Sequence, residues 1–378
     1  MLIERTIVSR HYVGLIVMLP CLFACQFCFA QPQAKNEFTI VQQDGRNNGK
    51  YGFIDRTGKV VVPFQFDHAW DFSEGLAQVE LKGRKYFIDT TGRTVFEAKF
   101  DEVENFSEGL CAVNRGQKID QNNGVVTNPG RWGYIDKTGK LVIPLKYTHA
   151  ENFSEGLAAI SNGDKGAFID HDAKIVFEVP LRVTLDFHEG IVGIFYLTNL
   201  AYFDRTGKQI SPTLKYGTKN HSFSEGLVPV EINGKTGFMD RSGKLVIAPQ
   251  FEEAGDFSEG LAPVKVRGEF MTRCPREPSG YRDSFRMIWG YIDKTGKMVI
   301  PAQYAWAEPF SEGLAAINHC GEGFFIDKTG KKIALGNYSH VSPFVAGLSR
   351  VYVGTNEERM WGYINRTGKI VWGPFKYL

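Results

Sequence analysis

The chain has 378 residues, of which 43% are hydrophobic and 23% are charged, with 44 basic and 42 acidic side chains. These proportions are typical of an ordinary folded protein, and they exclude an intrinsically disordered or collagen-like chain. The near balance of charge gives no electrostatic reason to expect nucleic acid or an anionic lipid surface as a partner.

The first thirty residues predict a secretory signal peptide. Arg5 and Arg10 precede an apolar run over residues 12–24, and small residues stand before the polar segment that follows, so cleavage is expected after Ala30. The protein is then exported, to the periplasm or the extracellular space, and its mature chain has no membrane span. Two alternatives stay open, an uncleaved anchor and a lipoprotein whose first mature residue is Cys25, since "LFAC" loosely resembles a lipoprotein box.

Residues 31–378 are interpreted as one domain of about nine tandem repeats. Two landmarks recur in phase, because Glu74 and Glu108 are 34 residues apart, and so are Asp55 and Asp89. The glutamate of "SEG" recurs at Glu74, Glu108, Glu155, Glu189, Glu225, Glu259 and Glu312, with Ala346 in the eighth place. The acidic residue of "GYIDKTGK" recurs at Asp55, Asp89, Asp136, Asp170, Asp204, Asp240, Asp293 and Asp327, with Asn365 in the ninth place.

The pattern inside each repeat predicts an all-β protein. Runs such as "LAQVEL", "YFID" and "LVIP" are short, rich in β-branched and aromatic residues, and bounded by turn residues. "DKTGK" predicts a tight turn whose Asp accepts a local backbone N–H and whose Gly is left-handed. The Glu and Gly of "FSEGL" are expected to form a second bend inside the unit. Each 34-residue unit is therefore predicted to have three strands, and a lone unit buries too little apolar surface to fold without its neighbours.

Three segments carry a resemblance to a known family: "RWGYIDKTGKLVIP" (residues 131–144), "WGYIDKTGKMVIP" (289–301) and "WGYINRTGK" (361–369). Together with "FSEGLA" they resemble the bacterial WG-repeat family, also called KWG repeats, from about Phe38 to the C-terminus. The resemblance implies a repeat scaffold shaped as a β-propeller-like closed ring, in proteins of mostly unknown role. An open β-solenoid is the alternative arrangement, and the resemblance supplies no catalytic residues.

Three insertions fall at one equivalent place in the repeats, near residues 115–131, 267–287 and 354–360. Because loops at one place crowd one face of a repeat array, they are expected to form a binding surface. Cys274 in the second insertion and Cys320 at the equivalent tip of the next unit are a possible disulfide, with two free thiols as the alternative. Within the second insertion, the Arg and aromatic side chains typical of interface hot spots are Arg273, Arg276, Tyr281, Arg282, Phe285 and Arg286.

No sequence motif indicates catalysis, a metal site or a cofactor, so an enzyme is not expected. The main prediction is an exported, non-catalytic binding scaffold whose ligand is a protein or a cell-envelope glycan. A hydrolase-like envelope enzyme and a purely structural envelope protein are the alternatives. The enzyme alternative would place its site at a variable position six residues before the SEG glutamate: His68, Glu102, His149, Val183, Lys219, Glu253, Trp306 and His340.

Overall fold

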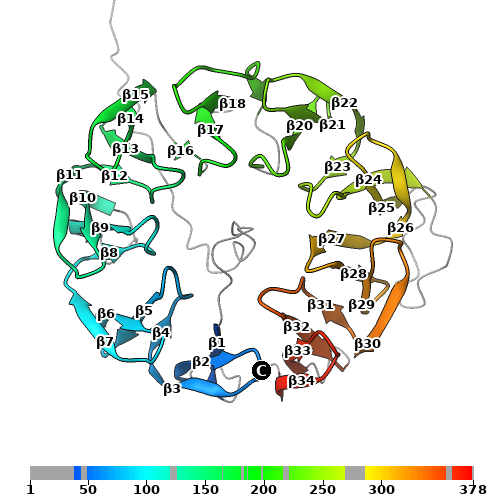
Figure 1. Ribbon diagram of the computed structural model, residues 1–378, viewed down its shortest axis with the longest axis horizontal. Coiled ribbons are helices and arrows are strands. Elements are labelled where there is room, and N and C mark those ends of the chain that lie inside the picture. The colour runs from blue at the N-terminus through cyan, green and yellow to red at the C-terminus, as the bar shows by residue number, and fades with distance from the viewer. Residues whose placement is uncertain are drawn as a thin grey trace, which may run out of the picture.

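The computed structural model describes residues 38–43, 49–119, 126–163, 165–179, 183–184, 186–196, 199–215, 221–268, 286–354 and 360–376. These residues form nine small antiparallel sheets that stand side by side around a central space (Figure 1). We number the sheets 1 to 9 in chain order. The predicted all-β fold is confirmed, and no helix in the described part of the chain has the length and apolar character needed to cross a membrane.

The strands follow one another along the chain without crossovers within a sheet. Sheets 1 to 3 contain β1 (Phe38–Gln42), β2 (Tyr51–Asp55) and β3 (Val60–Phe66); β4 (His68–Ala69), β5 (Leu76–Leu81), β6 (Arg84–Asp89) and β7 (Thr94–Ala98); β8 (Glu102–Val103), β9 (Leu110–Ile119), β10 (Val126–Asp136) and β11 (Leu141–Tyr147). Sheets 4 to 6 contain β12 (His149–Ala150), β13 (Ala158–Asn162), β14 (Lys165–Ile169) and β15 (Ile175–Val179); β16 (Val183–Thr184), β17 (Ile191–Tyr196), β18 (Asn199–Asp204) and β19 (Leu214–Lys215); β20 (Leu227–Ile232), β21 (Lys235–Asp240) and β22 (Leu245–Phe251). Sheets 7 to 9 contain β23 (Glu253–Ala254), β24 (Ala262–Gly268), β25 (Arg286–Ile292) and β26 (Met298–Tyr304); β27 (Trp306–Ser311), β28 (Leu314–His319), β29 (Glu322–Ile326) and β30 (Lys332–Tyr338); β31 (His340–Val341), β32 (Leu348–Val353), β33 (Met360–Asn365) and β34 (Ile370–Lys376).

Seven of the nine sheets have four strands rather than the predicted three. The additional strand is the first of its sheet, and it lies nearest the central space, while the last strand lies on the outer rim (Figure 1). In six sheets this innermost strand has only two residues, as in β4 and β8. A two-residue strand is too short to show an alternating hydrophobic pattern, which explains why the sequence did not predict it.

The "DKTGK" turns form as predicted, and the carboxylate of the first residue of each turn accepts hydrogen bonds from the residues that follow it. Asp136 Oδ1 accepts hydrogen bonds from Thr138 N at 2.9 Å, from Thr138 Oγ1 at 2.6 Å and from Lys140 N at 3.1 Å. Gly139 has a φ of 83°, which only glycine adopts without strain. Asn365 accepts the equivalent three bonds in sheet 9, so the turn needs a side-chain oxygen at this place and not a charge.

Stability at acid pH is expected to depend on these turn carboxylates. The hydrogen bond from the Thr138 hydroxyl is the main cause that lowers the pKa of Asp136; burial opposes it, and the backbone N–H groups of Thr138 and Lys140 lower the pKa further. A pKa that is lower in the folded than in the unfolded state stabilises the fold above the unfolded-state pKa of about 3.9, and this contribution is lost as the pH falls through the folded-state pKa. A carboxyl-carbon NMR titration of Asp136 should therefore show a midpoint below that value.

Asp136→Asn is the matched variant, because Asn365 already makes the same bonds. At pH 7 the variant should have the free energy of unfolding of the wild type. Its loss of stability between pH 7 and pH 3 should be smaller than that of the wild type by the contribution of Asp136, as measured by urea unfolding at the two pH values. A titration midpoint at or above 3.9, or an unchanged acid sensitivity, would contradict this account.

The "FSEGL" segment connects neighbouring sheets, in addition to forming the predicted bend. Both bend residues are left-handed, with φ of 54° at Glu108 and 83° at Gly109. Ser107 Oγ donates a hydrogen bond to the Phe153 carbonyl oxygen of the next sheet at 2.6 Å, and Gly156 N of that sheet donates to Glu108 Oε2 at 2.9 Å. We call this pair of bonds a clasp. Equivalent serine bonds join Ser73 to Phe106, Ser154 to Phe187, Ser224 to Phe257, Ser258 to Phe310 and Ser311 to Phe344.

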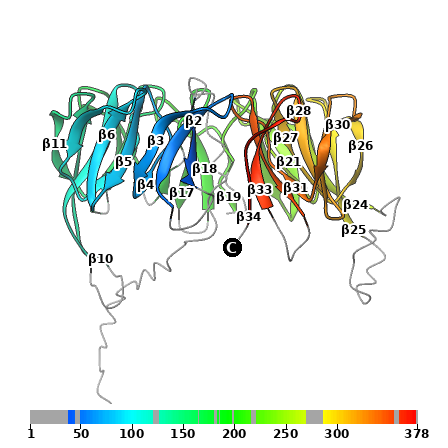
Figure 2. The same ribbon diagram turned by 90° about the horizontal axis from the view of Figure 1, so that it is seen from below.

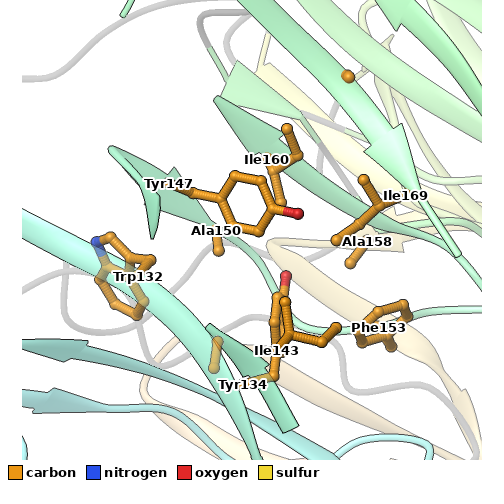
Figure 3. Packing of buried hydrophobic residues seen from close by; sticks show 11 residues of the cluster. Trp132, Tyr134, Ile143, Tyr147, Ala150, Phe153, Ala158, Ile160 and Ile169 are labelled. Carbon is orange, nitrogen blue, oxygen red and sulfur yellow. The ribbon is translucent and has the colours of Figure 1, made fainter. Parts of the chain in front are cut away.

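Neighbouring sheets also share a hydrophobic core, as the sequence predicted. Between sheets 3 and 4, Trp132, Tyr134 and Ile143 of one sheet pack against Phe153 and Ile160 of the other (Figure 3). The rings of Tyr134 and Phe153 lie 5.0 Å apart, and the Phe of "FSEG" is almost fully buried. This side chain therefore belongs to the junction between two units and not to one unit alone.

Sheet 9 packs against sheet 1 (Figure 1). Trp372 stacks on Phe64 with ring centroids 5.6 Å apart, and Leu348 shares a buried cluster with Val41 and Ile54. The turn glycine of sheet 1, Gly58, lies against the backbone of Val371, just as the turn glycines of other sheets lie against the sheet before them. The last and the first sheet are thus joined by hydrophobic and turn contacts like those between consecutive sheets, whereas Val345 and Ala346 stand where most units have the serine and glutamate of the clasp.

Candidate functional site

The strands that flank the three insertions, β9 and β10, β24 and β25, and β32 and β33, end on one face of the ring (Figure 2). The insertion near residues 115–131 is largely a strand extension and not the expected loop, because Arg115 pairs with Arg131 and Ile119 pairs with Val126. Backbone pairing of this kind turns the extra residues into a longer hairpin, whose tip, residues 120–125, lies outside the described residues.

The predicted binding residues of the second insertion are not tested by the structure. Arg273, Arg276, Tyr281, Arg282 and Phe285 lie outside the described residues, and Arg286 begins β25 with its backbone paired to Gly268. Cys320 is disulfide-bonded, and its predicted partner, Cys274, lies outside the described residues. The pairing of these two cysteines stays a prediction.

The variable position predicted from the sequence lies on the innermost strands. The second residue of the innermost strand is apolar and buried in four sheets, as Ala150, Ala254, Ala307 and Val341. The residues on either side of it point the other way, because side chains alternate along a strand. Those flanking residues, which we call the inner wall, are His68, Trp70, Glu102, Glu104, His149, Glu151, Glu253, Trp306, Glu308 and His340. Trp70 and Trp306 are 38% and 40% exposed, unusually high for tryptophan.

Two sheets on the ring present a similar polar pair on the inner wall. His149 Nε2 lies 2.7 Å from Glu151 Oε1 in sheet 4, and Trp306 Nε1 donates to Glu308 Oε1 at 2.7 Å in sheet 8. In sheet 2 the same two places hold His68 and Trp70, whose rings are 6.3 Å apart. The inner wall therefore combines flat aromatic rings with carboxylate acceptors.

Acidic side chains gather on the inner wall of sheets 3 and 4. Desolvation raises the pKa of Glu104, and the negative charges of Glu151 and Glu102 raise it further. Glu104 is accessible to water from the central space, yet the surrounding walls of the ring reduce its solvation. The hydrogen bond that the Glu151 carboxylate accepts from His149 raises the pKa of His149 above its usual 6.5, against an opposing effect of burial.

His149 is expected to titrate above pH 6.5 in an NMR titration of its ring protons. Its charged form is stabilised in the folded state, so the contribution to stability is present below the unfolded-state pKa and is lost as the pH rises through the higher folded-state pKa. Glu151→Gln should lower the midpoint, because the carboxylate is the main cause of the shift. An unchanged midpoint in this variant would contradict the assignment, and Lys146→Ala on the outer strand β11 is the matched control.

The residues at the variable position six before the SEG glutamate are brought together only in part. Glu102 and His149 interact across neighbouring sheets, whereas the neighbours of His68 are the rings of Tyr51 and Trp70. Lys219 lies outside the described residues, and no side chain is described for Val183. No group of three or more His, Cys, Asp or Glu residues in the described part of the chain has the arrangement of a metal site.

Sequence reasoning missed the second row of the inner wall, four residues before the SEG glutamate. Glu104, Glu151 and Glu308 belong to this row. The signal that could have revealed it is the small apolar residue between the two rows, Ala69, Ala150 or Ala307, because an apolar residue between two polar ones is the alternation of a half-buried strand. Three residues alone are too few to establish such a pattern.

Comparison with known proteins finds one family, described as the WG containing repeat, at residues 51–86, 87–118, 132–165, 237–270, 289–319 and 361–374. No curated protein sequence matches the chain. Among solved structures the chain is similar to a eukaryotic initiation factor, with a TM-score of 0.57 and 13% identity, covering 91% of this chain and 98% of that chain. It is also similar to Hsv2 from Kluyvelomyces marxianus, with a TM-score of 0.36 and 10% identity, covering 66% of this chain and 96% of that chain. At 13% identity the likeness to the initiation factor concerns the fold alone.

Proposed function

Because this chain belongs to the WG-repeat family, we propose that it is an exported, non-catalytic binding scaffold whose ligand is a protein or a cell-envelope glycan. The family supplies the frame, and the side chains that differ from sheet to sheet supply the binding surface. The proposed ligand contacts the inner wall, and the three insertions add contacts from one face of the ring.

The observation that carries this proposal is the contrast between the frame and the inner wall. The Ser and Glu of the clasps make hydrogen bonds that join neighbouring sheets, and the Asp of the turns makes hydrogen bonds that close each turn. The inner-wall residues change from one sheet to the next, and two exposed tryptophans lie among them. Variable side chains on a constant repeat frame are typical of a binding surface.

The chemistry of the inner wall suits both proposed classes of ligand. The exposed faces of Trp70 and Trp306 offer apolar area against a sugar ring or a peptide side chain. Glu151 and Glu308 offer carboxylate oxygens that accept hydrogen bonds from hydroxyl or N–H groups. Aromatic and polar groups of this kind commonly line ligand sites.

A binding assay tests the proposal: the protein is immobilised and offered purified cell-wall glycan in one experiment and extracted envelope proteins in another. The double variant Trp70→Ala and Trp306→Ala should bind at least tenfold more weakly than the wild type. Val176→Ala, at an exposed residue of the outer strand β15, is the matched control and should bind normally. Equal binding by all three proteins would contradict the proposal for the inner wall, and loss of binding only on deletion of residues 269–285 would assign it to the second insertion.

The proposed export has its own test. The mature N-terminus is expected at Gln31, in the periplasmic or secreted fraction of the producing cells, as measured by intact mass and N-terminal sequencing. A lipid-modified N-terminus at Cys25 would assign the protein to the lipoprotein alternative. A chain that keeps residues 1–30 and is found in the membrane fraction would support the alternative of an uncleaved anchor.

A second candidate function is a glycan hydrolase, favoured by the raised pKa of Glu104 beside Glu151. A protonated Glu104 could donate its proton to a leaving oxygen while the carboxylate of Glu151 activates water. Turnover of a cell-wall glycan by the wild type, abolished by Glu104→Gln and by Glu151→Gln, would establish this activity. Binding without turnover would leave the non-catalytic scaffold.

A further inference from the structure

The tryptophan of the WG pair lies behind the inner wall of the next sheet. We call its place the WG position; it is four residues before the acidic residue of the turn, as Trp132 is before Asp136. The inner-wall residue that it faces follows 17 residues later, as His149 follows Trp132. Rings meet at this contact in three junctions, with centroids 6.0 Å apart for Tyr51 and His68, 5.9 Å for Trp132 and His149, and 5.5 Å for Trp289 and Trp306.

The contact is different where the WG position holds no aromatic residue. Lys85 of sheet 2 is followed by Glu102, and its Nζ donates a hydrogen bond to the carbonyl oxygen of Asp101 beside that glutamate. At Gly323 the backbone of the next sheet takes the space, since an added Cβ would lie 2.7 Å from the carbonyl carbon of His340. The side chain at the WG position therefore decides what can rest against it on the inner wall.

The two rings of a pair differ in their access to a ligand. Trp132 and Trp289 are 7% and 2% exposed, so a ligand in the central space does not reach their faces. The side chain of His149 is 53% exposed, and Trp306 is among the exposed tryptophans. A buried tryptophan at the WG position acts on a ligand only through the exposed ring that it supports. A ring already held on one face loses less conformational freedom when a ligand packs on the other.

In the junction between sheets 3 and 4, the buried tryptophan is the centre of a chain of contacts that joins the inner walls of both sheets. Glu102 Oε2 accepts a hydrogen bond from Asn114 Nδ2 at 3.0 Å, and Asn114 is paired across the strands with Trp132. The Trp132 ring meets His149 of sheet 4, whose Nε2 lies 2.7 Å from Glu151 Oε1. The exposed ring of His149 is thus accompanied by a carboxylate of its own strand and by one of the preceding sheet.

The junction between sheets 7 and 8 has the same chain at the same five places of the repeat. Glu253 Oε2 is 3.1 Å from Lys265 Nζ, which lies 5.7 Å from the ring centroid of its cross-strand neighbour Trp289. Trp289 meets Trp306 of sheet 8, whose Nε1 donates to Glu308 Oε1 at 2.7 Å. The two junctions are four sheets apart among the nine and lie on opposite sides of the central space (Figure 1).

We propose that these two junctions are matching subsites for a glycan, and that Trp132 and Trp289 are their positioning residues. The proposal rests on the proposed function, because it names one ligand class for the inner wall and the residues that prepare the wall for it. Each subsite presents an exposed ring, His149 or Trp306, together with two carboxylates. The buried tryptophan fixes that ring before the ligand arrives, which lowers the entropy cost of binding.

A sugar ring fits this chemistry better than a peptide. Its face carries C–H groups that pack on an aromatic ring, and its edge carries hydroxyl groups that donate hydrogen bonds to carboxylate oxygens. An apolar peptide side chain lacks these donors, and a basic side chain has its donors only at the tip. A glycan of repeated sugar units also offers the same chemical groups to both subsites.

Replacement of Trp289 tests the positioning role, with peptide-free glycan strands released from purified cell wall as the probe. In isothermal titration of the full chain, Trp289→Leu should bind about fivefold or more weakly than the wild type. Trp289→Phe keeps a ring behind Trp306 and should restore most of the affinity. Phe238→Leu is the matched control, because this fully buried ring of β21 packs on Phe257, and the variant should bind normally.

A double-mutant cycle separates positioning from a general loss of structure. Trp306→Leu removes the exposed ring and should weaken binding as much as Trp289→Leu does. The double variant should bind no more weakly than either single variant, because the two residues act as one unit. Additive losses would overturn the positioning role. Urea unfolding should show similar losses of stability for Trp289→Leu and Phe238→Leu, although only the first loses affinity.

Nuclear magnetic resonance of the free protein tests the other subsite. Ring protons of Trp132 and His149 should show a nuclear Overhauser contact in the wild type, a measurement that does not depend on the folding of a variant. Trp132→Leu should shift the ring resonances of His149, whereas Trp289→Leu, in the opposite subsite, should leave them unchanged. Absence of the contact, or unchanged resonances in Trp132→Leu, would overturn the assignment of Trp132.

The outcomes distinguish this proposal from the proposed function. Normal glycan binding by Trp289→Leu, together with weak binding by the Trp70→Ala and Trp306→Ala double variant, would overturn the positioning role and leave the inner wall as the binding surface. Normal binding by both would contradict the inner wall itself. Binding of extracted envelope proteins without binding of the glycan strands would overturn the choice of a glycan.

Discussion

Replacement of Phe153 by alanine is expected to lower the free energy of unfolding by about 3–5 kcal/mol. The phenylalanine is 1% exposed, lies 5.0 Å from the ring of Tyr134 and stacks on His171 at 4.3 Å. Truncation leaves a cavity between sheets 3 and 4 that the strands on either side cannot close, because their backbones are fixed by pairing. Urea unfolding of the full chain, followed by circular dichroism, measures the loss.

Val176→Ala in the outer strand β15 is the matched control for this prediction. Val176 is 44% exposed, so its truncation should change the free energy of unfolding by about 0.5 kcal/mol or less. Similar losses for the two variants would show that the buried "FSEG" phenylalanine does not hold the junction. A loss at Phe153 confined to its own pair of sheets, seen by hydrogen exchange, would show that the ring unfolds in parts.

The second large effect is expected for Gly243→Ala, which should cost about 3 kcal/mol or more. Gly243 has a φ of +84°, and an added Cβ would lie 1.9 Å from the carbonyl oxygen of Ile210 in the preceding sheet. The left-handed conformation alone costs an alanine roughly 1–2 kcal/mol. The clash adds to this cost because the contacted atom belongs to the backbone, so one sheet must move away from the other. Denaturant unfolding again measures the difference.

Gly226→Ala separates the two causes. Gly226 has a φ of +87°, but no described atom lies within 4 Å of the position that its Cβ would take. Its replacement should cost only the roughly 1–2 kcal/mol of the left-handed conformation. Equal costs for the two glycines would mean that close packing of the turn on the preceding sheet contributes nothing to stability.

The sequence predicted those features that depend on local chemistry. The 34-residue period followed from residues such as Glu74 and Glu108, and the "DKTGK" turn followed from the known preferences of Asp and Gly. Short β-branched runs were enough to assign three strands to each unit. The need for a shared core followed from the small size of the unit, and the packing of Phe153 confirms it.

The features that the sequence did not predict depend on distant partners. Ser107 and Phe153 are 46 residues apart, so no local pattern shows that the serine bonds the next sheet. The carboxylate of Glu108 was interpreted as part of a bend, whereas it accepts the N–H of Gly156 across a junction. The inner wall could not be recognised either, because its place at the centre depends on how the sheets are arranged. The first insertion was expected to be a loop because its polar residues hide the strand pairing of Arg115 with Arg131.

The clasp has a direction, and this has an evolutionary consequence. A unit with the clasp residues offers a donor and an acceptor to the unit that follows, and its own carbonyl and N–H to the unit that precedes, as Ser107 and Phe153 show. When a unit with the clasp residues is copied, its neighbours need no matching change, because the copy carries the groups that contact the preceding unit as well as those that contact the following unit. Unequal recombination could therefore add or remove a whole unit without loss of a clasp, and the angle between neighbours would then decide which copy numbers close.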